Sequence, residues 1–388
     1  MRHILYLTYQ ENPFVGNKAI IKTQVEELLK VLSEEEDITW IMIYNEKLGI
    51  SASDVAKYEE DLKKNKIRFV AIECGYSNIY TAFFNLKRII KNYLSENATE
   101  IIHCRGYAMT LMANLVKTNE KVIFDMRGVE PQENRLNKRF PANYINYFFF
   151  SLMEFYNVRR SESIIAVTDY FKSYIVSKHG CGEEKVKVIH CCVNTEKIRF
   201  SSEWRDRIRE ELGCKDSKIV VFSGSIKDKW QSFDKIAKLY ITLSQQLGNA
   251  KFILLTRDKD MDFSLYGLDP ANVMVRYVDN SDVYKYLSAS DIALLTRNES
   301  IINAVAFPVK FAEYMACGVP TVINESMKGL VGIIEGKGIV YKGEQEAFDE
   351  LLSIKRESCM EFSRKWLDTK VVAGIYHKLY RELLPNKM

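Results

Sequence analysis

Short runs of β-branched and apolar residues alternate with amphipathic helical stretches along nearly all of the 388 residues of this chain. Such alternation is typical of βαβ units, in which parallel strands form a sheet and helices cover both of its faces. It therefore predicts an α/β protein. The expected strands are Ile4–Leu7, Ile38–Tyr44, Ile67–Ile72, Glu100–Cys104, Lys121–Asp125, Ser163–Val167, Val186–Ile189, Lys218–Phe222, Lys251–Leu255, Val273–Arg276, Asp291–Leu295, Pro320–Ile323 and Gly338–Tyr341.

The alternation stops at His190–Phe200 and then restarts, which indicates two Rossmann-like, doubly wound domains. We expect the first domain at 1–195 and the second at 196–365. A helix within about 366–388 is expected to pack back on the first domain. Ligands of such sheets bind beyond the carboxyl ends of the strands, so the cleft between the domains is the expected site.

Charge and composition exclude several classes of protein. The net charge of +4 is too small for a dedicated nucleic-acid-binding protein. No run approaches the ~20 apolar residues of a membrane span, and no apolar signal-peptide region follows Met1. The eight cysteines are scattered without a CxxC pair, as in proteins of a reduced compartment. We therefore expect a cytoplasmic protein without a nucleic-acid partner.

Several signatures of nucleotide binding and hydrolysis are absent from the sequence. It contains no GxGxxG after an expected strand, no GxxxxGK[ST] and no GxSxG. These absences disfavour an NAD-type Rossmann enzyme, a P-loop protein and an α/β-hydrolase. The function of the two expected domains therefore belongs to another class of protein.

The segment Asn303–Val322 carries the most informative spacing. Pro308 is suited to begin a helix that Cys317–Gly318 would end. Lys310 and Glu313 then share one helical face. A helix N-terminus with a nearby lysine suits a phosphate, and a carboxylate one turn on can accept two ribose hydroxyls. From spacing alone, a solvated Lys–Glu pair on an ordinary helix is the simpler interpretation.

Residues 308–320, PVKFAEYMACGVP, are similar to the nucleotide-sugar signature of family 4 glycosyltransferases, which have the two-lobed GT-B fold. VIHCCVNTEKI (188–198) resembles the linker of that family, and VVFSGSIKDKW (220–230) resembles the start of its second domain. The resemblance implies retaining transfer of a sugar from a nucleoside-diphosphate (NDP) sugar to a hydroxyl of a glycan or lipid-linked acceptor, often in bacterial surface polysaccharide synthesis. It implies no cofactor and no metal ion.

The resemblance also assigns site residues in the second domain. Lys310, Lys229 and the helix N-terminus at Phe307–Pro308 would stabilise the departing diphosphate, and Glu313 would bind the ribose. The expected nucleotide-sugar-binding residues are Gly224, Ser225, Lys229, Asn303, Phe307, Pro308, Lys310 and Glu313.

Two positions depart from the pattern of the family. Val305 stands where many members have a first glutamate for the sugar, so Glu299, Ser300 or Asn303 would have to replace it. Ser225 stands where many members have a phosphate-binding arginine. The positive charge would then come from Lys227, Lys229 or Lys310.

Polar residues end two strands of the first domain. His103 and Arg105 end one strand, and Asp125 and Arg127 end the next. Since the carboxyl ends of the strands border the expected cleft, we expect all four side chains to face it, with His103 and Arg105 on the acceptor side. The resemblance places FDMRG (124–128) and the Gly16–Asn17 turn on the acceptor side, with Asp125 and Arg127 also as catalytic candidates. Solvated loop residues are the alternative interpretation.

Two further segments allow two interpretations each. Arg135–Arg160 has an aromatic body and basic ends, as in a helix at an anionic membrane surface, but apolar positions all round it favour a buried helix. Asp258, Asp260 and Asp262 form a DxD pattern. It suits either a divalent-metal clamp or a polar loop, and we favour the loop because the rest of the chain lacks the clamp's fold.

Two other functions remain open from the sequence. A nucleotide-sugar 2-epimerase has the same fold and would process its sugar nucleotide without an acceptor. A non-catalytic sensor would bind a sugar nucleotide without turnover.

Overall fold

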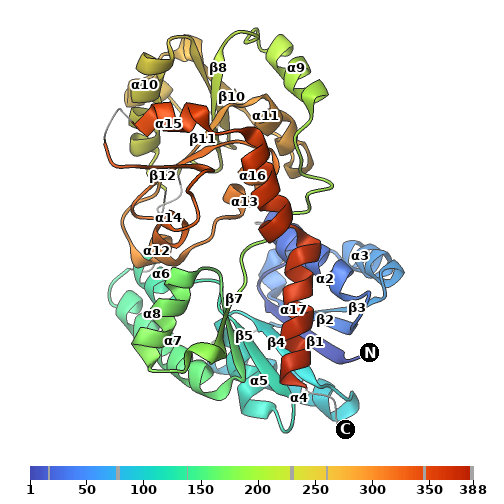
Figure 1. The fold of residues 1–388 in the computed structure, drawn as a ribbon. Coiled ribbons are helices and arrows are strands. Elements are labelled where there is room, and N and C mark those ends of the chain that lie inside the picture. The colour runs from blue at the N-terminus through green and yellow to red at the C-terminus, as the bar shows by residue number, and fades with distance from the viewer. Residues whose placement is uncertain are drawn as a thin grey trace. The chain divides into compact units, whose positions relative to one another are not determined.

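The computed structural model describes residues 1–15, 18–75, 79–137, 139–227, 231–258, 261–343 and 347–384. The chain divides into two compact units (Figure 1). Unit 1 comprises Met1–His190 and Thr369–Met388, and unit 2 comprises Cys191–Asp368. Each unit is built on its own parallel sheet.

Unit 1 contains a seven-stranded sheet in the order β3-β2-β1-β4-β5-β6-β7. Every neighbouring pair is parallel, so the carboxyl ends of all seven strands lie at one edge. The strands are β1 His3–Tyr9, β2 Asp37–Tyr44, β3 Ile67–Glu73, β4 Ile101–Arg105, β5 Lys121–Asp125, β6 Ser163–Ala166 and β7 Val186–Val188. The helices are α1 Lys18–Ile21, α2 Glu27–Leu32, α3 Ala52–Lys64, α4 Ile79–Glu96, α5 Tyr107–Val116, α6 Glu130–Asn137, α7 Ala142–Arg160, α8 Asp169–His179 and α17 Thr369–Leu383.

The C-terminal helix α17 belongs to unit 1, although the whole of unit 2 separates it from the rest of that unit in sequence. It lies beside α2 (Figure 1). Glu36 is completely buried and accepts hydrogen bonds from Arg2, and its Oε1 lies 3.1 Å from Nδ1 of His377 in α17. Contacts with α2 and the buried contact between His377 and Glu36 thus join α17 to unit 1.

Unit 2 contains a six-stranded parallel sheet in the order β10-β9-β8-β11-β12-β13. The strands are β8 Lys218–Ser223, β9 Ala250–Leu255, β10 Val273–Arg276, β11 Ile292–Leu295, β12 Thr321–Asn324 and β13 Gly338–Tyr341. The helices are α9 Ser202–Glu211, α10 Phe233–Leu247, α11 Val283–Ala289, α12 Ile301–Val305, α13 Val309–Ala316, α14 Lys328–Val331, α15 Ala347–Ser353 and α16 Arg356–Phe362.

The central strands are apolar on both faces because helices cover both sides of each sheet. Ile4–Leu7 in β1 and Ile219–Phe222 in β8 are completely buried. This burial explains why continuous apolar runs marked the strands, and every expected strand is present in the structure. The fold class is therefore the expected α/β class with two Rossmann-like sheets.

Helix α7 corrects one expectation. Its buried residues lie on a single face and include Met153, Glu154 and Val158. Large apolar residues on the other side are exposed, among them Phe148 and Leu152. The interpretation of Arg135–Arg160 as a fully buried helix was therefore wrong, because neighbouring helices cover only part of its circumference. No helix of the described residues is long and apolar enough to cross a bilayer.

Candidate functional site

The turn after β8 is the first part of the candidate site in unit 2. Gly224 follows the strand with φ = +136°, a backbone conformation that side chains with a Cβ rarely adopt. The Ser225 hydroxyl and the Ile226 N–H donate to Oδ2 of Asp258 at 3.1 and 2.7 Å. Asp258 therefore fixes the shape of this turn from the neighbouring strand end.

In the part of the chain that the structure describes, the carboxylates of the DxD pattern accept hydrogen bonds from nearby backbone N–H groups. Burial works against ionisation of Asp258, but its bonds to Ile226 and Ser225 lower the pKa of this carboxyl. Oδ1 of Asp262 accepts from the Ser264 N–H at 3.0 Å. Asp260 lies outside the described residues. This use of Asp258 and Asp262 favours the polar-loop interpretation.

Lys310 lies directly over the Gly224 turn. A Cβ added at Gly224 would lie 1.7 Å from Nζ of Lys310, so the ammonium occupies the space that any other residue would fill. The same Nζ lies 5.5 Å from the ring centroid of Phe222. Pro308 caps helix α13, and Lys310 stands in its first turn. Unit 2 thus brings the turn, the cation and a helix N-terminus together, which is a suitable arrangement for a phosphate.

Glu313 stands one turn further along α13. The residue is 7% exposed, and its carboxylate forms no hydrogen bond or ion pair with the described residues. Burial raises the pKa of Glu313 to about 7, and the charge of Lys310 offsets part of this rise. A nearly buried carboxylate without a partner is costly to maintain, and perturbed pKa values of this kind cluster at functional sites.

The structure gives Asn303 and Ser300 roles that differ from the expected sugar contacts. Asn303 is completely buried, accepts from Nη1 of Arg297 at 3.2 Å and donates to the Asn298 carbonyl at 2.8 Å. The Ser300 hydroxyl accepts from the Asn303 N–H and caps α12. These bonds hold the segment after β11 in place. Of the three suggested replacements for the missing glutamate, only Glu299 is exposed.

Phe307 is also buried, with its ring 5.6 Å from that of Phe311 in an edge-to-face contact. It supports the start of α13 from inside. Two expected site residues, Lys229 and Gly16, lie outside the residues that the structure describes.

Sequence reasoning missed two residues of this region. Nε2 of Gln231 lies 3.3 Å from the position that a Gly224 Cβ would take. The side chain of Arg297 donates to Asn303, and the backbone N–H of Arg297 donates to Oδ1 of Asn324 at 3.1 Å. Arg297 stands two residues beyond the end of β11, and polar residues at this position of a parallel strand were the available signal.

The candidate acceptor residues of unit 1 come together at the ends of two adjacent strands. Arg105 in β4 pairs in register with Asp125 in β5, and His103 lies two residues earlier on the same face. Oδ2 of Asp125 accepts from Nε of Arg127 at 2.8 Å, and Nε2 of His103 lies 3.6 Å away. Nε of Arg105 donates to Glu11 at 2.5 Å.

The charges of this cluster follow from its burial and its arginines. Burial alone would raise the pKa of Asp125, but Arg127, His103 and Arg105 outweigh it and lower the pKa to about 2. Burial lowers the pKa of His103 despite the neighbouring Asp125. At neutral pH the cluster therefore holds an ionised aspartate and a neutral histidine.

Helix α17 covers two of these residues, which corrects their expected role. The side chains of His103 and Asp125 are completely buried. The Tyr380 hydroxyl lies 2.7 Å from Nδ1 of His103, and Nη2 of Arg127 donates to the Tyr376 hydroxyl at 3.1 Å. Asp125 and His103 therefore position Arg127 and α17 rather than face a ligand. Arg127 keeps part of its surface exposed.

Glu11 is a further residue of this edge that sequence reasoning missed. It follows β1, which lies between β2 and β4 in the sheet. Its carboxylate accepts the hydrogen bond from Arg105 described above. Its place two residues beyond a strand end was again the available signal.

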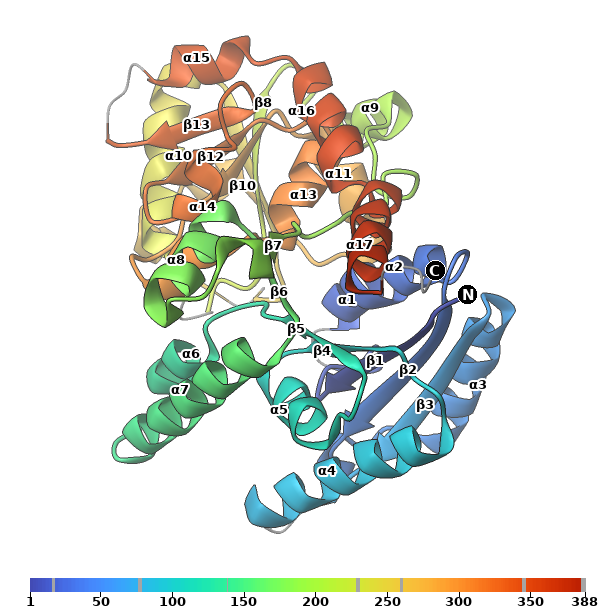
Figure 2. The same ribbon diagram turned by 60° about the horizontal axis from the view of Figure 1, so that its bottom comes forward.

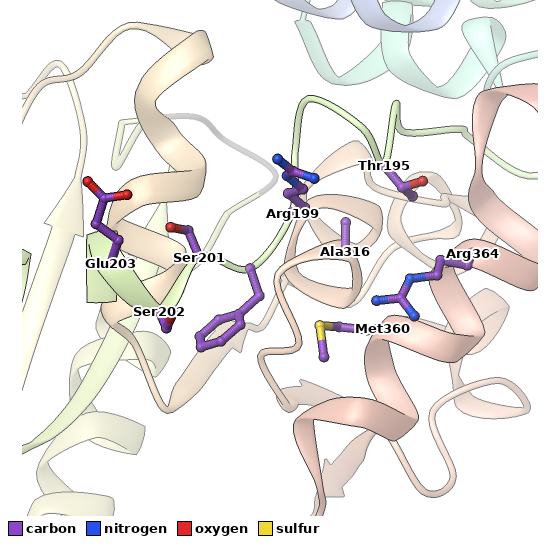
Figure 3. Close-up of a pocket in the computed structure, with 9 residues that line it drawn as sticks. Thr195, Arg199, Ser201, Ser202, Glu203, Ala316, Met360 and Arg364 are labelled. Atoms are coloured by element: carbon purple, nitrogen blue, oxygen red, sulfur yellow. The ribbon is translucent and has the colours of Figure 1, made fainter. Parts of the chain in front are cut away.

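Unit 2 also contains a cavity of about 510 Å³ (Figure 3). Arg199 and Arg364 line it, together with residues that begin α9. None of the residues expected from the sequence to bind a ligand lines this cavity. The full lining is Thr195, Arg199, Phe200, Ser201, Ser202, Glu203, Ala316, Met360 and Arg364.

Two family models match the sequence. The model of glycosyltransferase family 4 matches residues 29–197, and the model of glycosyl transferases group 1 matches residues 217–353. Together the two matches cover most of both units.

Two curated proteins resemble parts of the chain. TuaH of Bacillus subtilis, whose name assigns it to teichuronic acid biosynthesis as a glycosyltransferase, is 26% identical over 168 residues. An uncharacterized glycosyltransferase of Methanocaldococcus jannaschii is 24% identical over 249 residues. These matches cover 42% and 61% of this chain, and 41% and 60% of the respective relatives.

The solved structure of HepE from Anabaena in complex with UDP-glucose has a similar fold. It superposes with a TM-score of 0.68 over 98% of this chain and 100% of HepE, at 12% sequence identity. A glycosyltransferase from Rickettsia africae gives the same TM-score at 15% identity, over 100% of this chain and 99% of that protein.

Proposed function

Since the chain belongs to glycosyltransferase family 4, we propose that it transfers a sugar from an NDP-sugar donor to a hydroxyl of a glycan or lipid-linked acceptor. We propose that the transfer retains the anomeric configuration, needs no metal ion or other cofactor, and serves the synthesis of a bacterial surface polysaccharide. The name of TuaH and the UDP-glucose complex of HepE support this assignment. An acceptor carried on a lipid would bring the enzyme to a membrane surface.

One observation carries the proposal most strongly. Nζ of Lys310 lies over the Gly224 turn, and the unpartnered Glu313 carboxylate follows one helical turn later. An NDP-sugar offers two matching groups, a diphosphate for the cation and a pair of ribose hydroxyls for the carboxylate. In this proposal the nucleotide supplies the hydrogen bonds that Glu313 lacks in the free protein.

The reaction then follows from where charge develops. The bond between the sugar C1 and the diphosphate oxygen breaks, and a bond between C1 and the acceptor oxygen forms. The proton of the acceptor hydroxyl goes to an oxygen of the departing diphosphate. Lys310 and the N–H groups at the start of α13 stabilise the growing negative charge of the diphosphate. Lys227 can add positive charge because its ammonium lies 3.9 Å from Asp258, beside the same turn.

A panel of UDP-, GDP- and ADP-sugars tests the function. Thermal shift identifies the donor, because a ligand at 100 times its Kd adds about 2.7 kcal/mol of stability. The identified donor is then incubated with and without glycan and lipid-linked hydroxyl acceptors, and the product anomer is read by NMR. Acceptor-dependent NDP release is expected. A changed sugar at C2 without acceptor would show the epimerase instead, and tight binding without turnover would show the sensor.

The affinity for a nucleoside diphosphate is expected to depend on the ionisation of Glu313. With a pKa of about 7, this carboxyl is about one-tenth ionised at pH 6, and only the ionised form accepts both ribose hydroxyls. The Kd for UDP or the matching NDP should therefore rise by up to about tenfold between pH 8 and pH 6. Glu313→Gln should bind about tenfold more weakly at pH 8. Calorimetric titration at several pH values measures both effects.

The same variant provides its own control for folding. The pKa of Glu313 in the folded protein lies above its unfolded value, so the stability from this group is full in acid and lost as pH rises through about 7. Glu313→Gln should consequently melt at or above the parental temperature at pH 8. The ionisation of the nucleotide's own phosphate groups affects parent and variant equally, so a difference in pH dependence between the two proteins reports on Glu313. Equal Kd values and equal pH dependence in parent and variant would refute the role of Glu313.

Arg127 is expected to act on the acceptor rather than the donor. Arg127→Ala should lower transfer about ten- to hundredfold, the cost of a charged hydrogen bond, while the Kd of the NDP stays unchanged. Because Arg127 also neutralises buried Asp125, Arg127→Lys serves as a second variant that keeps the charge. Arg88→Ala, an exposed arginine on α4, is the matched control. A large loss of NDP affinity in Arg127→Ala would place this residue on the donor.

A further inference from the structure

Helix α7 presents a continuous apolar face that the described residues leave uncovered. Phe148 is 64% exposed and Leu152 is 70% exposed. The exposed residues recur at the spacing of one helical face. We define the α7 face as Tyr144, Ile145, Phe148, Phe149, Leu152 and Phe155.

The opposite side of α7 is firmly anchored, so this exposure is built into the fold. Glu154 is completely buried, and its carboxylate accepts from the Tyr107 hydroxyl of α5 at 2.5 Å and from Lys178 of α8 at 2.7 Å. Nε2 of His179 lies 2.8 Å from the same carboxylate. A rotation of α7 that hid the apolar face would break these bonds. Figure 2 shows α6 and α7 side by side at one edge of unit 1.

Both ends of the α7 face are basic. Arg135 and Arg139 lie at its N-terminal end, and Arg159 and Arg160 end the helix; all four are exposed. The guanidinium of Arg159 lies 4.2 Å from the ring centroid of Phe155, and that of Arg135 lies 5.3 Å from Tyr144. Within α7 the only acidic residue is Glu154, and it lies on the buried side. The face is therefore apolar and aromatic, with exposed arginines at both of its ends.

This charge pattern discriminates between occupants of the face. In a second copy of the chain, parallel or antiparallel pairing of two α7 helices would bring basic ends together in either direction, and like charges repel. An anionic lipid surface matches all parts of the pattern. Its acyl boundary takes the apolar side chains, its headgroup region favours aromatic rings, and its phosphates attract arginines.

We propose that the α7 face is a docking surface for an anionic lipid bilayer, on which α7 lies parallel to the membrane plane. The proposal stands on unit 1 alone. It adds to the proposed function a surface from which a lipid-linked acceptor could be used, but it does not depend on the donor site of unit 2.

Flotation without any nucleotide tests the proposal. The full chain is mixed with phosphatidylcholine vesicles, or with vesicles that also contain phosphatidylglycerol, at low and high NaCl. We expect it to float with the anionic vesicles at low salt and much less at high salt or with neutral vesicles. The double variant Phe148→Ser/Leu152→Ser should reduce the partition coefficient at least about tenfold. Arg159→Gln/Arg160→Gln should reduce it about fivefold per arginine.

Matched controls separate docking from general stickiness. Phe84 is 65% exposed on α4 and Leu265 is 81% exposed in unit 2, so Phe84→Ser/Leu265→Ser removes similar apolar surface elsewhere and should float like the parent. Phe148→Trp provides an independent readout. Its indole emission should shift to the blue with anionic vesicles and be quenched by brominated acyl chains.

Three outcomes would overturn the proposal. The first is that the parent chain fails to float with anionic vesicles at low salt. The second is that the α7 double variant floats as well as the parent, and the third is that the emission of the Phe148→Trp variant stays unchanged on vesicle addition. A dimer in light scattering that Phe148→Ser/Leu152→Ser dissociates, without vesicle binding, would identify a second copy as the occupant. Sugar transfer plays no part in these measurements, so a failure of the proposed function and a failure of docking are distinguishable.

Discussion

Replacing Lys310 with alanine is expected to lower the rate of sugar transfer about 100- to 1,000-fold, which corresponds to about 2.7–4 kcal/mol of transition-state stabilisation. The ammonium lies over the Gly224 turn at the start of α13. In the proposed reaction it is placed where the negative charge of the departing diphosphate grows. A preorganised cation at such a position acts mainly in the transition state, so the loss should appear in kcat more than in KM.

Gly224→Ala tests the same arrangement without removing the lysine. A Cβ at Gly224 would take the place of Nζ, and φ of +136° disfavours any side chain there. This variant should therefore reproduce much of the loss by displacing Lys310. Lys238→Ala, an exposed lysine on α10, is the control and should transfer sugar at the parental rate. Parental rates in both Lys310→Ala and Gly224→Ala would contradict the placement of the diphosphate.

Replacing Glu154 with alanine is expected to cost about 3–5 kcal/mol of the free energy of unfolding, the usual effect of removing one partner of a buried ionic network. The Glu154 carboxylate joins α7 to Tyr107 of α5 and to Lys178 and His179 of α8. Without it, the Tyr107 hydroxyl and the two basic groups lose their shared acceptor. Urea denaturation at neutral pH measures the difference.

The pH dependence of this difference has a definite sign. Burial works against ionisation of Glu154, but the bonds from His179, Lys178 and Tyr107 outweigh it and lower its pKa. Its stabilisation is therefore present above the unfolded pKa of about 4.3 and is lost as pH falls through the lower folded value. The difference in stability between parent and Glu154→Ala should therefore narrow in acid. Glu211→Ala removes an exposed partner, that of Arg207, and should cost at most about 1 kcal/mol. An equally small cost for Glu154→Ala would contradict the anchoring of α7.

The strands could be predicted from the sequence because a parallel sheet covered on both faces needs apolar, β-branched residues at nearly every position. The run Ile219–Phe222 is an example, since all four residues are completely buried. Helix α13 could be predicted for a similar local reason. Pro308 is its N-cap residue, and Gly318 adopts φ = +67° just beyond its end. The sequence signals for the start and the end of this helix are therefore local.

Contacts between distant segments could not be predicted in the same way. His103 and Asp125 were expected to face a ligand because they end strands, but Tyr376 and Tyr380 of α17 cover this edge from more than 240 residues away in sequence. Helix α7 shows the converse error. Apolar residues such as Phe148 indicate a surface whose exposure to water is unfavourable. The sequence does not show whether another part of the chain covers that surface.

Within the candidate donor site, the predictable part was the part set by one helix. Lys310 and Glu313 follow from helical spacing and from the family resemblance. The role of Asn303 depends instead on Arg297 and Asn298 around it. Gln231 belongs to the site through a contact in space, since its Nε2 lies 3.3 Å from the position of a Gly224 Cβ.

A crystal structure of the protein soaked or grown with the NDP identified by thermal shift tests the central claim most directly. The diphosphate is expected against the Gly224 turn, within hydrogen-bond distance of Nζ of Lys310, and both ribose hydroxyls are expected on the Glu313 carboxylate. A nucleotide bound elsewhere would contradict it, for example with its phosphates between Arg199 and Arg364 in the cavity of unit 2 and Glu313 still without a partner.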